Sequence, residues 1–133
     1  MSDGFAREAF IAHNQQMAEG GRQLTDLGNA ERMIQDYGED LRYCASWKKW
    51  LLWDGARWAT DQTNEIYDFA KRTVRNMYQT AAFLSNDQER RLLVDHALRS
   101  ESANRLRAMV EVAGWDPKIA VSPDDLDTNQ IGR

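Results

Sequence analysis

The clearest helical pattern in the chain lies between residues 66 and 84, where apolar side chains recur every three or four positions. This spacing places them on one face of a helix of about five turns, while the opposite face carries Lys71, Arg72, Arg75 and Asn76. The apolar face consists of Ile66, Phe69, Ala70, Thr73, Val74, Met77, Ala81 and Leu84. We therefore predict a long amphipathic helix, capped at its start by Asp61 or Thr63.

Three further helices are predicted from shorter patterns and from capping residues. Residues 27–37 have helical spacing after a Thr25-Asp26 cap, and Gly38 stands where a left-handed residue commonly ends a helix. The sequence Ser85-Asn86-Asp87-Gln88 has the form of a capping box. The helix after it is expected to bury Leu92, Leu93, Ala97 and Leu98. The last helix begins at Ser100 or Ser102, faces Ala103, Leu106, Met109, Val110 and Ala113 inward, and ends at Gly114.

Between the helix predicted at 27–37 and the long helix that begins at residue 66, the pattern favours strands. Asp54-Gly55 lies between two aromatic runs, which is a strong signal for a hairpin with a two-residue turn. That turn would oppose Trp53 to Ala56, Leu52 to Arg57 and Leu51 to Trp58. Leu51, Trp53 and Trp58 would then share one face of the hairpin, and Trp50, Leu52 and Arg57 the other. With a short strand at residues 41–44, the region predicts a three-stranded meander.

The predicted fold is mainly α with a small antiparallel β-meander, an α+β arrangement of one helix, three short strands and three helices. Residues 24–115 are expected to form this helical domain with its hairpin. Residues 1–23 are interpreted as an N-terminal helix, over about 3–18, or a linker. Residues 116–133 contain few apolar side chains and are predicted to be a loose C-terminal tail.

Composition places the chain among intracellular globular domains. It has 133 residues, a single cysteine and a net charge of −4. One cysteine permits no disulfide framework, and no apolar run is long enough to span a membrane. The N-terminal residues lack the basic and apolar regions of a signal peptide, so we expect a cytoplasmic protein with no membrane partner.

Motifs for catalysis are lacking in the sequence. It has no dinucleotide-binding or phosphate-binding loop, and His13 and His96 are far apart without neighbouring ligands. His96 is more readily explained as a buried histidine than as a ligand or base. We therefore expect no enzyme activity, no metal, no cofactor and no small-molecule substrate.

Two groups of cationic residues are candidates for DNA contact. Lys48, Lys49 and Arg57 are interleaved with tryptophans, a combination that can stack bases and follow phosphates. Lys71, Arg72 and Arg75 share the polar face of the long helix. In the plainer alternative, the tryptophans pack the hairpin onto the helices and the cations are ordinary solvated side chains.

Several segments resemble the N-terminal domain of the phage/plasmid primase family, the poxvirus-type primase-helicases whose helicase belongs to superfamily 3. The resemblance covers about residues 24–127. It is carried by residues 25–32 (TDLGNAER), by 37–43 (YGEDLRY) and by Trp50, Trp53, Asp54, Gly55 and Trp58, which fit a W-x-x-W-D-G-x-x-W element. Residues 96–102 (HALRSES) and Val121-Ser122 are also similar.

The resemblance implies a non-catalytic connector or collar domain next to primase and helicase modules. Its partners would be those flanking modules, other copies of the chain and, weakly, DNA. This family normally continues past the Val-Ser-Pro-Asp-Asp-Leu-Asp segment into an ATPase, whereas this sequence stops at Arg133. We interpret it as an excised domain or a free-standing small phage protein. The alternative function is a protein that binds a protein partner through its Trp-rich face.

Overall fold

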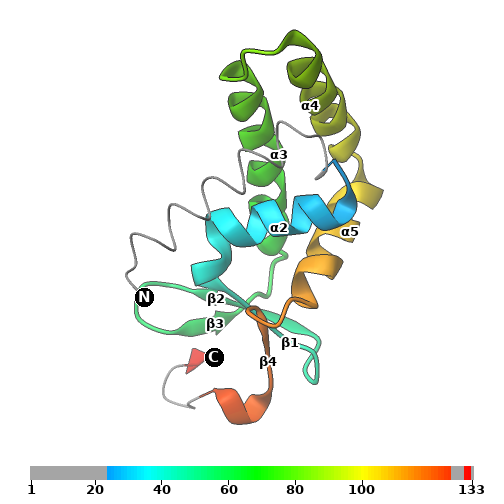
Figure 1. Cartoon of the computed structure of the whole chain (residues 1–133). Helices are drawn as coiled ribbons and strands as arrows, with labels where there is room; N and C mark the ends of the chain where they lie inside the picture. The colour runs from blue at the N-terminus through cyan, green and yellow to red at the C-terminus, as the bar shows by residue number, and fades with distance from the viewer. Residues whose placement is uncertain (1–23, 127–130, 133) are drawn as a thin grey trace.

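The computed structural model describes residues 24–126, 131 and 132, and their fold is mainly α with a small sheet (Figure 1). The helices are α2 (Asp26–Tyr37), α3 (Ile66–Ala82), α4 (Asp87–Ser100) and α5 (Ala103–Gly114). The strands are β1 (Leu41–Cys44), β2 (Lys49–Trp53), β3 (Trp58–Thr60), β4 (Ala120–Val121) and β5 (Ile131–Gly132). The predicted order of a helix, a meander and three helices is confirmed. The helix predicted over about 3–18 lies outside the described residues.

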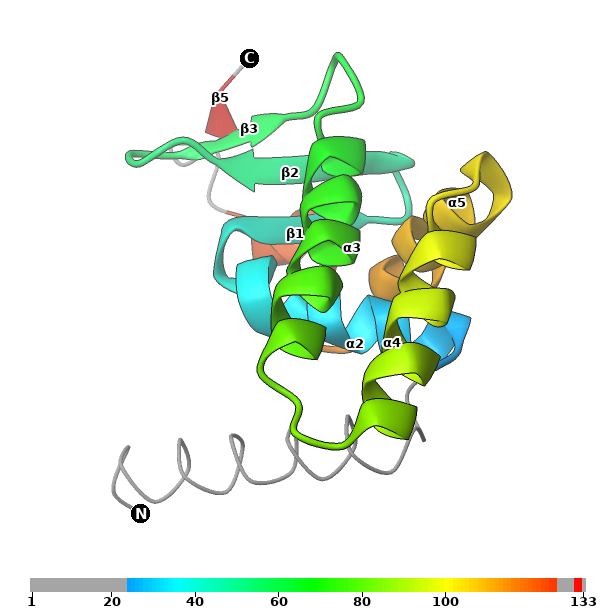
Figure 2. The same cartoon turned by 90° about the horizontal axis from the view of Figure 1, so that it is seen from above.

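The helices pack on one side of the sheet (Figure 1). Helices α3 and α4 form an antiparallel pair, and α2 and α5 pack against each other and against α3 (Figure 2). The ring of Trp50 from β2 packs against that of Tyr43 from β1, with centroids 5.1 Å apart. A Cβ added to Gly114 would lie 3.2 Å from the Tyr43 ring, so the end of α5 rests directly on this aromatic pair. This contact joins the sheet to the helical core.

Side-chain caps fix where the helices begin. Thr25 Oγ1 accepts the Gly28 amide at 2.9 Å, as predicted, and Ser102 caps α5. The carboxylate of Asp61 accepts amides at the start of α3, including that of Ile66 at 2.9 Å. The predicted capping box of α4 is one residue off, because Asn86 is the residue that caps the helix.

The structure corrects the predicted geometry of Gly38. Its φ of −60° is right-handed, and the chain continues into a short 3-10 helix, Gly38–Asp40. A glycine suits this position because an added Cβ would lie only 3.1 Å from Ile34 Cγ2. Close packing, not a left-handed backbone, therefore explains the residue.

The predicted two-residue hairpin turn is wrong. Trp53 pairs with Trp58, which leaves a four-residue loop at 54–57. Leu52 consequently pairs with Ala59 and Leu51 with Thr60, so Arg57 lies in the loop and opposes no strand residue. The carboxylate of Asp54 accepts the amides of Ala56 and Arg57 at 2.8 and 2.9 Å, which closes the loop from within. Leu51, Trp53 and Trp58 do share one face, as predicted.

The sheet has two strands that the sequence analysis did not predict. β4 pairs in parallel with β1, and β5 in parallel with β3, which gives the order β4-β1-β2-β3-β5. Both strands come from the segment predicted to be a loose tail. Each has only two residues, so neither shows a period in the sequence. The sheet is therefore mixed, with the predicted antiparallel meander at its centre.

The buried face of α4 also differs from the prediction. Leu93 and Ala97 are buried as expected, but Leu92 and Leu98 are 47% and 62% exposed. Two polar residues, His96 and Ser100, are buried instead. Because a buried polar side chain needs hydrogen-bond partners, this face of α4 must meet polar groups from elsewhere in the chain.

Candidate nucleic-acid interface and buried polar network

The cationic residues proposed from the hairpin lie at its two ends. Lys48 is in the β1–β2 turn with a positive φ of 53°, and Lys49 begins β2. Arg57 is in the loop that follows the other end of β2. All three side chains are exposed. The structure therefore separates Lys48 and Lys49 from Arg57, and they do not form one continuous site.

The three cations of α3 are exposed, but their surroundings are not purely basic. Lys71 and Arg75 line a shallow groove between α3 and the start of α5, together with Val74, Glu101 and Leu106. Lys71 Nζ also lies 3.1 Å from Asp68 Oδ1. Two carboxylates thus offset part of the positive charge, so contact with phosphates through this helix would be weak.

Arg72 lies beside these two cations on α3. Its guanidinium carbon is 5.1 Å from the ring centroid of Phe69, a cation–π contact that restricts the side chain. Phe69 in turn packs edge-on against Tyr37 of α2. Arg72 is therefore held at an exposed position near α2.

The tryptophans divide into structural and exposed groups. Trp50 is 9% exposed and belongs to the core, which supports the plainer interpretation for that residue. Trp53 and Trp58 pack edge to face across the hairpin, with centroids 5.4 Å apart. Trp47 and Trp115 are 40% and 66% exposed.

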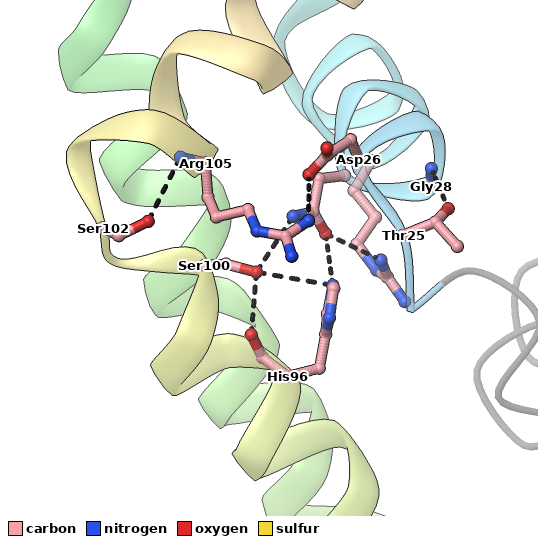
Figure 3. A network of polar contacts seen from close by, with 9 residues as sticks. Thr25, Asp26, Gly28, His96, Ser100, Ser102 and Arg105 are labelled. Atoms are coloured by element: carbon pink, nitrogen blue, oxygen red, sulfur yellow. Dashed lines mark hydrogen bonds and ion pairs between the residues drawn. The ribbon is translucent and has the colours of Figure 1, made fainter.

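A buried polar network joins α2 to α4 (Figure 3). Asn29, which is 0% exposed, donates from Nδ2 to Ser100 Oγ at 3.0 Å. Its Oδ1 lies 2.8 Å from His96 Nε2 and accepts from Arg32 Nη1 at 3.2 Å. Ser100 Oγ donates to the carbonyl of His96 at 2.7 Å, so its hydroxyl hydrogen is already used.

The arginine in this network fixes the orientation of the other groups. A guanidinium has no acceptor, so the Asn29 atom that faces Arg32 must be the amide oxygen. The same oxygen faces His96 Nε2, which must therefore carry the hydrogen. Each group then has a defined donor or acceptor role, so the network specifies how α2 packs on α4.

The histidine of this network is neutral at pH 7. Burial, and after it the positive charges of Arg32, Arg99 and Arg105, together lower the pKa of His96 to about 4. A neutral imidazole that donates to a buried amide serves to hold the helices together. Ser100 Oγ also lies 3.4 Å from His96 Nε2, but its hydroxyl hydrogen is donated to the His96 carbonyl and not to the imidazole.

An ion pair continues the connection at the protein surface. Arg105 Nη1 of α5 lies 3.0 Å from Asp26 Oδ1 at the start of α2 (Figure 3). The buried network thus joins the segments 25–32 and 96–102, which resemble the same family and are about 70 residues apart, and the ion pair adds a contact from α5 to the first of them. The sequence alone did not predict this link, because hydrogen bonding between distant segments leaves no local pattern.

Two further features, a metal-binding cluster and a membrane-spanning helix, are not found in the part of the chain that the structure describes. Over residues 24–126, 131 and 132, no cluster of three or more His, Cys, Asp or Glu side chains is arranged to hold a metal ion. In the same residues no helix combines the length and apolar character that crossing a bilayer requires.

Fold and site together define a small, mainly helical α+β domain whose helices are joined by a buried polar network. The chain belongs to the family described as D5 N terminal like, whose model matches residues 30–131. This domain is found in phage and plasmid primase-helicases, which relates the chain to DNA replication. The family is an N-terminal domain and not itself a catalytic module. No curated protein and no solved structure matches the chain.

Proposed function

We propose that the chain is a non-catalytic connector or collar domain of a phage- or plasmid-type DNA primase-helicase. It supports assembly of the helicase and contacts DNA weakly, in the cytoplasm of a bacterial host. The observation that carries this proposal is the family match over residues 30–131, which covers α3, α4, α5 and β1 to β4 in full and α2 and β5 in part. The domain needs no cofactor for this role.

The packing supports a connecting role because it makes the domain a rigid body. The Asn29 network fixes α2 against α4, and Arg105 links α2 to α5. The contact of Gly114 with Tyr43 and Trp50 fixes α5 on the sheet. A rigid domain of this kind holds one flanking module, or a second copy of the chain, in a fixed position relative to the next module.

The DNA contact is proposed to run through phosphates, because the candidate cations are all exposed. Lys71, Arg72 and Arg75 form the densest group, on two adjoining turns of α3. The neighbouring Asp68 and Glu101 keep this contact weak. Binding should therefore be measurable at low salt and fall steeply as salt is added.

The test is fluorescence anisotropy of a labelled single-stranded oligonucleotide with the full chain, measured over a range of salt concentrations. The variant Lys71→Glu/Arg72→Glu/Arg75→Glu should bind more weakly, and the slope of log K against log salt should fall by about 2. The control Arg91→Glu/Arg107→Glu/Lys118→Glu makes the same change in net charge at other exposed positions. If both variants lose affinity equally, or neither does, the α3 contact is refuted.

A second candidate function is favoured by the exposed indoles. Trp115 is 66% exposed and Trp47 is 40% exposed, which is unusual for the largest apolar side chain. A protein partner that covers them would account for both. A chain that associates with itself in sedimentation experiments, and shows no affinity for DNA at low salt, would support this alternative.

A further inference from the structure

The end of the β2–β3 hairpin presents two indoles on the sheet face that points away from the helical core. Side chains alternate along β2, so Trp53 points opposite to Trp50, which packs on the helices. Trp58 is the cross-strand partner of Trp53 and shares its face. Trp53 is 37% exposed and Trp58 is half-buried. We call these two residues the indole pair.

The loop beside the indole pair has a defined conformation. Asp54 donates its amide to the Arg57 carbonyl at 3.0 Å, and its carboxylate accepts two loop amides. Gly55 takes a φ of 103°, which residues with a side chain rarely adopt. The position of Arg57 relative to the indoles is therefore set by the loop backbone before any ligand arrives.

Two guanidinium groups flank the indole pair. The Arg42 guanidinium carbon lies 5.0 Å from the Trp58 ring centroid, and its Nη1 donates to the carbonyls of Gly38 and Leu41 at 2.7 and 2.6 Å. Arg57 is exposed and adjoins Trp58 in the chain. With Asp54 the only carboxylate in the loop, these three side chains have a net charge of +1.

An acidic groove adjoins the indole pair on its Trp53 side. Trp53 and Asp54 line it together with Asp61 and Glu65. The cationic groups lie on the Trp58 side of the pair, where the Arg42 guanidinium lies over the ring and Arg57 is the preceding residue. Aromatic rings provide stacking surfaces for any base, and guanidinium groups bind the phosphates between bases.

We propose that the indole pair is a base-stacking site for single-stranded nucleic acid, with a base on Trp53 and adjacent phosphates on Arg57 and Arg42. The inference rests on the DNA contact of the proposed function and specifies its substrate as an unpaired strand. A duplex hides the faces of its bases in the stack, so it cannot use an exposed indole in this way. The two guanidinium groups beside Trp58 favour a nucleic acid over an apolar protein segment at this place.

The experiment compares two oligonucleotides of equal length, about 12 nucleotides, one of thymidines and one of abasic residues. The full chain should bind the thymidine strand about fivefold or more tightly than the abasic strand. Trp53→Leu should remove this preference, while affinity for the abasic strand stays the same. The matched control is Trp115→Leu, the same change at a more exposed indole, which should keep the preference. Circular dichroism and thermal unfolding confirm that each variant is folded.

A second variant separates stacking from charge. Arg57→Gln should weaken the binding of both strands and lower the salt slope by about 0.7, without changing the ratio of their affinities. Lys118→Gln, at an exposed position elsewhere, is its control.

Three results would overturn the inference in distinguishable ways. Equal affinity of the wild type for both strands would show contact with phosphates alone, and would leave the proposed function in place. A preference that persists in Trp53→Leu would locate stacking elsewhere. No binding of either strand at low salt would refute the DNA contact together with the inference, and would favour a protein partner.

Discussion

Replacing Asn29 by alanine tests whether the buried network holds the helices together. Asn29 makes three side-chain hydrogen bonds, to Ser100, His96 and Arg32, and is fully shielded from water. In Asn29→Ala, the Nε2 hydrogen of buried His96 loses its acceptor at 2.8 Å and keeps only the long contact to Ser100 Oγ at 3.4 Å. Ser100 keeps its hydrogen bond to the carbonyl of His96, so the loss of Asn29 costs less stability at Ser100 than at His96.

The expected cost follows from these contacts. A hydrogen bond contributes about 1 kcal/mol net, and a buried donor left without a partner costs about 1–3 kcal/mol. The free energy of unfolding should therefore fall by about 3 kcal/mol, a large part of the total stability of a domain of this size. Urea denaturation at pH 7, followed by circular dichroism, measures the change, with the m-value expected to stay constant.

Asn76→Ala is the matched control. Asn76 also bridges two helices, donating to Asp36 and to the Tyr37 hydroxyl, but this contact lies at the partly exposed edge of α3. Water replaces the lost partner there, so the loss should stay below about 1 kcal/mol. If Asn29→Ala costs no more than Asn76→Ala, the network does not have the structural role assigned to it.

The remaining predictions concern pH, the hairpin loop and a helix cap. His96 has a pKa of about 4 when folded against 6.5 ordinarily, so the unfolded chain takes up its proton first. The contribution of neutral His96 to stability is fully present above pH about 6.5, and the free energy of unfolding should fall by about 3 kcal/mol as the pH drops to 4. In urea titrations over the same pH range, His96→Gln should not show this fall. Gly55→Ala should lower stability by about 1–2 kcal/mol through backbone strain alone, since no atom lies within 4 Å of the added Cβ, and Ala56→Gly should change it little. Ser102→Ala should cost about 1 kcal/mol in thermal unfolding by removing the cap of α5, and an unchanged melting temperature would contradict this.

Local sequence signals predicted the elements well because each of them acts over a few residues. The spacing of apolar residues in α3 and the caps at Thr25 and Ser102 depend on neighbours within one or two turns. The same reasoning predicted the three strands of the meander correctly, but the hairpin loop wrongly. Asp54 closes a four-residue loop with its own carboxylate, and this option has the same Asp-Gly signature as a two-residue turn.

Features that depend on distant partners were not predictable in this way. A count of apolar residues assigns Leu92 and Leu98 to the core, yet the buried positions are His96 and Ser100, whose partner Asn29 lies 67 and 71 residues away. The two-residue strands β4 and β5 exist only through pairing with β1 and β3. Backbone pairing of this kind leaves no side-chain pattern.

The candidate DNA site shows the same limit. The sequence places Lys48, Lys49 and Arg57 within ten residues, but the hairpin carries them to opposite ends of β2. Conversely, Arg42 was not a candidate, although the sheet brings its guanidinium onto the ring of Trp58. Strand pairing decides which cations meet an aromatic ring, and the register was the part of the hairpin for which the prediction was wrong.

The central claim, that this domain contacts DNA through exposed cations, is tested most directly by the affinity of the unmodified chain for single-stranded DNA as a function of salt. Fluorescence anisotropy at about 50 mM salt should show saturable binding, with log K falling linearly as log salt increases and a slope of about −2 or steeper. Binding that is absent at this salt concentration, or that does not change with salt, would contradict the claim.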